Sequence, residues 1–358
     1  MTAHDSFAGR AARTLAHLAE AAATPLLPAD YLDLVAPLRS GAHRARIQAV
    51  RAQTGTATTL VLRPAGRWPG HRPGQHVRLG VEVDGVRHWR SYSLTSPTAS
   101  DGTISVTVSA HPQGVASNHL VYRAKVGDVV GLDGPDGDFT MTSPVPDKAL
   151  FVSGGSGITP VMGMLRESID ALPDAVLVHS ARTRDSVLFG AELRLWATEG
   201  RLHLVERITS DEGRLDADEI EALVPDLDQR ETWVCGPNGL VDDVVARYDA
   251  RGWSDRLHVE RFRPSRAAAG DGGAVTFVRH GLTVEADASA SLLDAGESSG
   301  VLLPSGCRMG ICFGCVVPLV EGTVRDVRNG SLTSADHGDA VLIQTCINAA
   351  AGPCRIDA

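Results

Sequence analysis

Four cysteines near the end of this 358-residue chain constrain it more than any other feature. Cys307, Cys312 and Cys315 follow the spacing C-x4-C-x2-C, and 30 residues separate Cys315 from Cys346. Three thiolates on one short loop and a fourth on a distant segment are the ligand pattern of a [2Fe–2S] cluster. A zinc site is the weaker alternative, because it would show two cysteine pairs with shorter internal spacing. We therefore predict that these four cysteines bind iron.

The N-terminus and the remaining cysteines are consistent with a reducing compartment. Asp5 and Glu20 interrupt what would otherwise resemble a secretory signal, and no run of 18 apolar residues exists. We expect a cytoplasmic chain that does not span a membrane, in which thiols stay reduced. Cys354 then fits a small buried hydrophobic residue rather than a disulfide partner.

Charge separates one part of the chain from the rest. The whole protein has a net charge of -9, which argues against a general nucleic-acid binder. Residues 43–144 nevertheless carry 11 basic and 7 acidic side chains, a net charge of +4. A basic domain suits an anionic ligand such as a phosphorylated cofactor, and scatter among surface charges is the alternative.

Changes in the apolar pattern predict the domain organisation. Short apolar alternations within 43–144, broken by Gly and Pro, predict an antiparallel sheet or small barrel. Within 145–263, apolar runs alternate with helical segments, which predicts a parallel α/β sheet. We expect a linker at 264–273 and a compact module at 274–358. Helical spacing within 8–22 makes residues 1–42 an expected N-terminal helical extension.

Individual elements are expected at particular residues. The predicted strands are 58–62, 76–83, 91–94, 104–108, 150–152, 176–178 and 232–235. A helix is expected near 160–171.

Two turns of the α/β segment are candidates for binding phosphates. The sequence Phe151 to Pro160 follows an apolar run and opens a helix, so its glycines let the backbone approach an anion. Thr159 is the expected N-cap and Pro160 the first helical residue. The sequence Thr232 to Gly239 ends a later strand, at the sheet edge where ligands bind. A plain strand-to-helix turn and a buried Cys235 thiol are the alternatives.

The basic segment holds two further candidate sites. Arg90 to Ser93 close a strand with the cation, aromatic ring and hydroxyl that a flavin phosphate and ring require. Gly114 to Leu120 begin a helix whose N–H groups could hold a pyrophosphate. Ordinary strand alternation and simple helix capping are the alternatives.

In this order, the motifs resemble the ferredoxin–NADP reductase superfamily with a fused C-terminal plant-type [2Fe–2S] ferredoxin domain. The resemblance covers residues 43–358. Within the superfamily the chain is most similar to actinobacterial reductases of acyl-CoA desaturases, on the segments 27–32 and 306–312. It implies a multidomain fold: an antiparallel β-barrel flavin domain, an α/β parallel-sheet NAD(P) domain and an α+β (β-grasp) ferredoxin domain.

The resemblance also implies roles for individual residues. Those implied for FAD are Arg90 on a phosphate, Tyr92 stacked on the isoalloxazine, Ser93 near N5, Ser91 beside them, and Gly114, Val115, Ala116 and Ser117 on the pyrophosphate. Those implied for the nicotinamide dinucleotide are Gly155, Gly157, Thr159 and Pro160 on its phosphates and Cys235, Gly236 and Pro237 beside the nicotinamide. Glu260 and Phe262 would lie by the flavin. Ser93, Cys235 and Glu260 form the catalytic set, with a plain surface role as the alternative for Glu260.

These roles describe an NAD(P)H:acceptor oxidoreductase with FAD and a [2Fe–2S] cluster. Ser180 and Arg182 offer a hydroxyl and a cation for a 2′-phosphate, which favours NADPH. Asp185 nearby keeps NADH open.

The expected acceptor is a membrane acyl-CoA desaturase, with a Rieske oxygenase or a cytochrome P450 as alternatives. The chain would then be cytoplasmic, or peripheral at the membrane through its partner. Its N-terminal helix would pack on the flavin domain or, with only Arg10 and Arg13 basic, bind a membrane feebly. A cluster-based sensor or binding protein is the alternative of another class, and the nucleotide sites argue against it.

Overall fold

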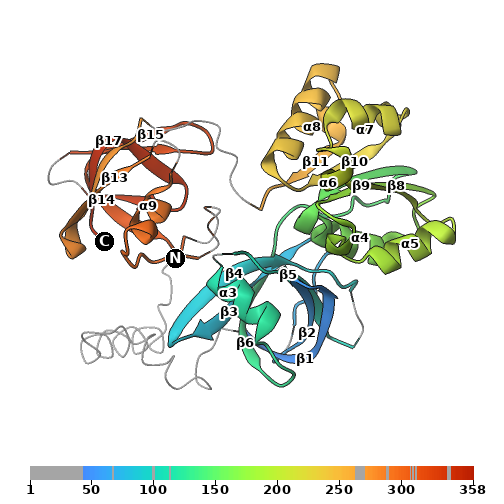
Figure 1. The fold of residues 1–358 in the computed structure, drawn as a ribbon, viewed down its shortest axis with the longest axis horizontal. Helices are drawn as coiled ribbons and strands as arrows, with labels where there is room; N and C mark the ends of the chain where they lie inside the picture. The colour runs from blue at the N-terminus through green and yellow to red at the C-terminus, as the bar shows by residue number, and fades with distance from the viewer. Residues whose placement is uncertain are drawn as a thin grey trace, which may run out of the picture. The chain divides into compact units, whose positions relative to one another are not determined.

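The structure is a computed structural model. It describes residues 43–66, 68–98, 101–112, 114–262, 271–287, 290–306, 308, 310, 313–336 and 340–358. The predicted extension at 1–42, with its helix at 8–22, lies outside the described residues, and so do Cys307 and Cys312. The fold described below is that of Arg44–Ala358, one of the two units into which the chain divides (Figure 1).

The first part of this unit is a six-stranded antiparallel sheet that curls around helix α3. Its elements are β1 (His43–Thr54), β2 (Ala57–Pro64), β3 (His76–Val83), β4 (Val86–Ser93), β5 (Ile104–Ser109), α3 (Val115–Tyr122) and β6 (Val129–Asp136). The strand order is β4-β3-β6-β1-β2-β5, and a bridge between Leu94 and Val106 joins the two edges. Alternate residues such as Leu60, Leu62 and Leu79 are fully buried, which is why a period of two in the sequence predicted this sheet.

The second part is a five-stranded parallel sheet with helices on both faces (Figure 1). Its strands are β7 (Lys148–Gly154), β8 (Asp174–Ala181), β9 (His203–Ile208), β10 (Glu231–Cys235) and β11 (Leu257–Glu260), in the order β11-β10-β7-β8-β9. Its helices are α4 (Ile158–Ser168), α5 (Gly190–Thr198), α6 (Thr209–Glu212), α7 (Ala217–Leu223) and α8 (Asn238–Arg251). Short 3-10 turns are η2 (Gly155–Gly157), η3 (Arg184–Ser186), η4 (Leu227–Gln229) and η5 (Ser254–Arg256). Because helices cover both faces, the central strands are continuous apolar runs.

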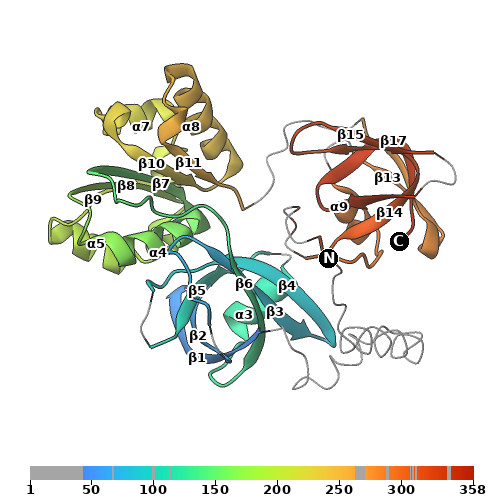
Figure 2. The same cartoon turned by 180° about the vertical axis from the view of Figure 1, so that it is seen from behind.

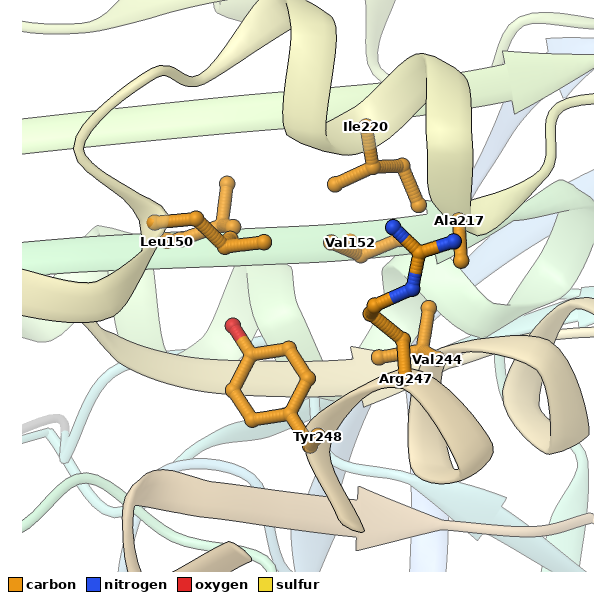
Figure 3. A pocket seen from close by; sticks show the side chains of 8 residues that line it. Leu150, Val152, Ala217, Ile220, Val244, Arg247 and Tyr248 are labelled. Atoms are coloured by element: carbon orange, nitrogen blue, oxygen red, sulfur yellow. The ribbon is translucent and has the colours of Figure 1, made fainter. Parts of the chain in front are cut away.

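The pocket drawn in Figure 3 belongs to the core of this second part. Leu150 and Val152 of β7 face Ile220 of α7 and Val244 and Tyr248 of α8 (Figure 3). The space between these side chains has no room for a water molecule. It is therefore a packed seam between the sheet and its helices, on the face opposite to α4 and α5.

The third part is a mixed sheet with one helix packed against it, the β-grasp arrangement that was predicted. Its elements are β12 (Gly273–Phe277), η6 (Val278–His280), β13 (Leu282–Ala286), α9 (Leu292–Ser298), β14 (Val316–Asp326), β15 (Leu332–Ala335), β16 (Val341–Gln344) and β17 (Asn348–Ile356). The order is β13-β12-β17-β14-β15, with β16 paired to β14. Strands β12 and β17 run parallel and the other pairs antiparallel. Figure 2 shows helix α9 beside the strands of this part. Most of the range expected to be a linker lies outside the described residues, and Gly273, its last residue, begins β12.

The predicted multidomain fold class is confirmed, with local corrections. The prediction that Thr159 caps the helix and Pro160 begins it was wrong: α4 begins at Ile158 and its N-cap is Gly157, because η2 leads straight into the helix. Strands β1, β6, β9 and β11 were not predicted. Strand β1 lacks strict alternation because it contains irregularities after Ile47 and Ala52.

Candidate flavin, nicotinamide and cluster sites

Strand β4 carries four of the predicted flavin residues on its two faces. Arg90 and Tyr92 pair with Leu79 and Val77 of β3, so they lie on the face that carries the barrel's core residues. Burial raises the pKa of Tyr92 to about 12, and the Arg90 charge opposes that shift. The guanidinium Nη1 of Arg90 donates to the Trp89 carbonyl at 2.7 Å and to the Gly306 carbonyl at 3.4 Å.

Ser91 and Ser93 lie on the other face of β4. The Oγ of Ser91 is buried and has no hydrogen-bond partner among the described residues. A buried hydroxyl without a partner is costly, so the site fits a bound group that supplies one. Ser93 is the last residue of β4 and is 5% exposed, so its hydroxyl is buried where the strand ends.

Helix α3 begins as predicted next to the glycine of the proposed pyrophosphate site. Gly114 is the N-cap, and a Cβ there would overlap the Oγ of Ser117. That Oγ accepts from the His111 backbone N–H at 3.2 Å and donates to the Gly114 carbonyl at 3.3 Å. The N–H groups of Val115 and Ala116 fall in the first turn, where helices leave backbone donors free to bind an anion.

The two glycine turns of the parallel sheet lie against each other. A Cβ at Gly157 would overlap the Cys235 carbonyl, and a Cβ at Gly154 would lie 2.6 Å from Cδ of Pro237. Gly155 has φ of +54° and open space around it, so the turn η2 exposes its backbone there. Thr159 and Pro160 are buried in the first turn of α4, and the Thr159 hydroxyl donates to the Ser156 carbonyl at 2.9 Å. Tight packing thus joins the predicted phosphate turn to the predicted nicotinamide turn.

Glu260 and Cys235 are direct neighbours at the carboxyl edge of the sheet. The register of β10 and β11 pairs these two residues. Burial raises the pKa of Glu260 to about 7. Burial also raises the pKa of the Cys235 thiol well above its usual range, and the Glu260 charge adds to that rise. This pair therefore combines a neutral thiol with a carboxyl that exchanges its proton near neutral pH. Phe262, two residues later, packs against the core beneath α4.

Glu260 and Cys235 are part of a line of paired residues across the parallel sheet. This row continues with two residues that sequence reasoning missed. Cys235 pairs with Ser153 of β7, and Ser153 pairs with His179 of β8. Ser153 Oγ lies 2.8 Å from Nδ1 of His179, and both side chains are buried. Burial lowers the pKa of His179 to about 4, so the imidazole is neutral. Each residue directly follows a predicted strand, 150–152 and 176–178, but only the register reveals that the two are adjacent.

Three stacked aromatic rings lie two residues before the end of β10. Trp233 lies between Phe151, with centroids 5.3 Å apart, and His258, with centroids 4.8 Å apart. The indole Nε1 of Trp233 donates to the carbonyl of Thr140 at 3.1 Å. The stack and this hydrogen bond fix the position of the Trp233 ring, two residues before Cys235.

The end of β8 carries the residues predicted to select the nucleotide. Ser180 is buried, and its hydroxyl donates to the Ser153 carbonyl at 3.5 Å. Arg182 is exposed, its carbonyl accepts from Ser210 N at 3.0 Å, and no described carboxylate lies within ion-pair distance of its guanidinium. Asp185 lies in η3, where Thr183 and Ser186 form a capping box. An exposed arginine therefore follows a buried serine by two positions at this edge of the sheet.

Two of the predicted iron ligands lie among the described residues, and their sulfurs meet. Sγ of Cys315 lies 3.2 Å from Sγ of Cys346, and this hydrogen bond lowers the pKa of the Cys315 thiol to about 6. The hydroxyl of Thr345 donates to the Cys315 carbonyl at 3.1 Å, and Gln344 Nε2 donates to the Gly310 carbonyl at 2.9 Å. Two converging thiols of which one ionises readily suit iron, because thiolates are the ligands of such clusters. Cys354 is buried elsewhere in the sheet, as expected.

Family models match the three parts of the chain in the same order. An oxidoreductase FAD-binding domain matches residues 59–141, an oxidoreductase NAD-binding domain matches 151–246, and a 2Fe-2S iron-sulfur cluster binding domain matches 275–350. The chain therefore belongs to the ferredoxin reductase-type oxidoreductases that combine FAD-binding, NAD-binding and 2Fe–2S ferredoxin domains. The predicted enzyme class and cofactor-binding domains are confirmed.

Particular relatives agree with this assignment. An NADPH oxidoreductase of Mycobacterium tuberculosis is 48% identical over 343 residues, which cover 93% of this chain and 89% of the relative. A glycine betaine monooxygenase reductase subunit of Pseudomonas aeruginosa is 30% identical over 77% of this chain and 84% of its own length. Phthalate dioxygenase reductase shares the fold, with a TM-score of 0.61 at 21% identity over 89% of this chain and 98% of that protein. No helix of the described residues is long and apolar enough to cross a membrane.

Proposed function

We propose that this protein takes electrons in pairs from NADPH and delivers them singly to an oxygenase-type acceptor protein. The contact between the Gly154–Gly157 turn and the Cys235–Pro237 turn carries the proposal, because it joins a phosphate cradle to the Cys235–Glu260 pair. Bound FAD would accept a hydride from the nicotinamide and pass its electrons one by one to the iron–sulfur cluster. The protein contributes positioning and electrostatics.

Individual residues serve that task as follows. Arg90 and Tyr92 bind the flavin from one face of β4, Ser91 offers it a hydroxyl from the other face, and the Ser93 hydroxyl at the end of the strand orients its reactive edge. The backbone of Gly114 to Ser117 binds the pyrophosphate. The neutral Cys235 thiol borders the nicotinamide, and Glu260 holds a proton on its carboxyl next to that thiol. Phe262 covers the flavin side, while Cys307, Cys312, Cys315 and Cys346 hold the iron.

NADPH is the proposed donor. The exposed Arg182 and the Ser180 hydroxyl suit a 2′-phosphate, and the relative that is 48% identical is named an NADPH oxidoreductase. We expect Arg182→Ala to lower kcat/KM for NADPH at least 10-fold and to leave kcat/KM for NADH within 2-fold. A wild-type preference for NADH, or equal losses with both donors, would contradict this choice.

The acceptor is proposed from two sources. The resemblance to reductases of membrane acyl-CoA desaturases supports a desaturase, which would place this protein in the cytoplasm or at the membrane through its partner. The name of the Pseudomonas aeruginosa relative, a monooxygenase reductase subunit, supports an oxygenase acceptor instead. Reconstitution with each purified acceptor distinguishes them. With the true partner, the rate of NADPH oxidation should match the rate at which the acceptor forms its product.

Anaerobic titration tests the electron-transfer proposal itself. Adding NADPH to purified holoprotein should bleach the flavin absorbance and then the cluster absorbance. Bleaching of neither chromophore by NADPH or NADH would overturn the proposed function.

A further inference from the structure

Helix α4 is buried on nearly all sides, whereas a helix on the face of an α/β sheet ordinarily exposes one side to solvent. Its residues from Ile158 to Leu165 are all buried, and Ser168 is buried as well. Such a helix needs apolar partners around its whole circumference. One side packs on the parallel sheet, and the same core cluster includes Ala57 and Phe139 of the antiparallel part. Helix α4 therefore lies between the two sheets.

The middle of α4 touches the chain directly after the flavin strand. A Cβ at Gly163 would overlap the carbonyl oxygen of Leu94 and would lie 3.3 Å from the backbone nitrogen of Gly74. Leu94 follows Ser93 immediately. Only a residue without a side chain permits this approach of helix to backbone.

Two charged side chains extend the same contact by one turn of α4. Arg166 Nη1 donates to the Thr95 carbonyl at 2.5 Å, and Glu167 accepts from the Thr98 N–H at 2.8 Å. The Arg166 guanidinium is itself fixed: it forms a fork on Glu192 at 2.9 and 2.6 Å and lies 5.0 Å over the Phe189 ring. A preorganised guanidinium loses little entropy when it binds a further carbonyl.

We infer that α4 is a rigid spacer in which Gly163 and Arg166 are positioning residues that set the distance between the nucleotide turn at its N-terminus and the flavin strand. This inference rests on the proposed function. About 1.5 helical turns separate Ile158, next to the phosphate turn, from Gly163. Any shift of the helix against Leu94 therefore moves the bound nucleotide relative to Ser93. A misplacement of about 1 Å can cost about 100-fold in rate without weakening binding.

Gly163→Ala tests the spacer most directly. The added methyl must push α4 away from Leu94, so hydride transfer at saturating NADPH, measured as anaerobic flavin bleaching in a stopped-flow instrument, should slow at least 10-fold. The Kd for NADP+, measured by calorimetry, should stay within 2-fold. Gly55→Ala is the control, because this glycine, in the turn between β1 and β2, has nothing within 4 Å of an added Cβ and lies outside the candidate sites.

Arg166→Gln provides an independent variant should Gly163→Ala fail to fold. It removes the hydrogen bond to Thr95 and should lower the saturated rate at least 5-fold with the same NADP+ affinity. Arg194→Gln is its control, because Arg194 forms a similar fork on Glu206, at 2.9 Å for both bonds, on the far side of α5.

The possible outcomes test the role of α4 as a spacer and the proposed function separately. Wild-type bleaching together with wild-type rates in folded Gly163→Ala or Arg166→Gln protein overturns the spacer and leaves the function standing. A loss that appears only in the NADP+ Kd overturns the spacer too, because it would place the residues in the binding site. Failure of the wild type to bleach with either nucleotide overturns both.

Discussion

At the scale of single residues, burial gives Glu260 its chemistry. Its carboxyl lies at the end of β11 beside the buried Cys235, and desolvation raises its pKa to about 7. Hydrogen bonding to the Arg261 backbone N–H lowers the pKa only in part. A carboxyl whose proton is half lost near neutral pH is suited to exchange protons during turnover.

This shifted pKa predicts a dependence of stability on pH. The unfolded carboxyl loses its proton near pH 4.5 and the folded one near pH 7, so unfolding becomes easier as pH rises through that window. The difference of about 2.5 units corresponds to roughly 3 kcal/mol in the free energy of unfolding. Glu260→Gln cannot ionise, so its stability relative to wild type should be greater at pH 8 than at pH 5.

Chemical denaturation at both pH values with excess FAD measures this difference. Glu285→Gln changes an exposed residue of β13 and should show no such gain at pH 8. Parallel behaviour of the wild type and Glu260→Gln across the window would refute the argument.

At the scale of elements, the turn η2 depends on the strand beside it. Gly157 ends this turn against the Cys235 carbonyl at the end of β10, so the phosphate cradle cannot form independently of the nicotinamide turn. The N-terminus of α4 then presents its first N–H groups at the same place.

Gly157→Ala should uncouple these elements. The new methyl overlaps backbone on β10, so the turn must move, and the Kd for NADP+ should rise at least 10-fold, or about 1.4 kcal/mol. FAD and iron content should not change, because those sites lie on other strands. Gly55→Ala, in the turn between β1 and β2 with nothing within 4 Å, should bind NADP+ like the wild type. Calorimetric titration provides both values.

At the scale of the whole molecule, electrons must pass through sites that three separate sheets provide. The antiparallel and parallel parts share one apolar cluster, whereas the ferredoxin part has a cluster of its own. Loss of the iron site should therefore leave the other two sites intact.

Cys346→Ser tests this modular order. Removing the thiol that contacts Cys315 should abolish bound iron and sulfide and lower reduction of cytochrome c at least 50-fold. FAD content and NADPH-dependent reduction of ferricyanide, which the flavin can perform alone, should stay within 2-fold. Cys354→Ala removes a buried thiol of the same sheet and should keep the cluster with a stability loss of about 1 kcal/mol. Normal iron content in Cys346→Ser would remove that residue from the ligand set.

Much of the candidate site could be predicted because the cysteine loop and the glycine turns are short, continuous segments of sequence. A cluster or a phosphate is held by a loop of a few residues, so the cysteine spacing and the glycine turns carry their signal locally. The strand 76–83 was predicted with its observed bounds because its alternation is regular, whereas the irregular β1 escaped notice. The helix start was misplaced by two residues, because Thr159 and Pro160 suit the first turn of a helix as well as its cap and first position.

The amino-acid sequence by itself determined the three fold classes, the four proposed iron ligands and the two glycine turns, since each depends on neighbours along the chain. Only the tertiary structure decided that Ser153 and His179 extend the row of Cys235 and Glu260, and that Gly163 lies against Leu94. Those contacts join residues that are far apart in the chain. Strand register and helix packing create these contacts, and a local sequence pattern predicts neither the register nor the packing.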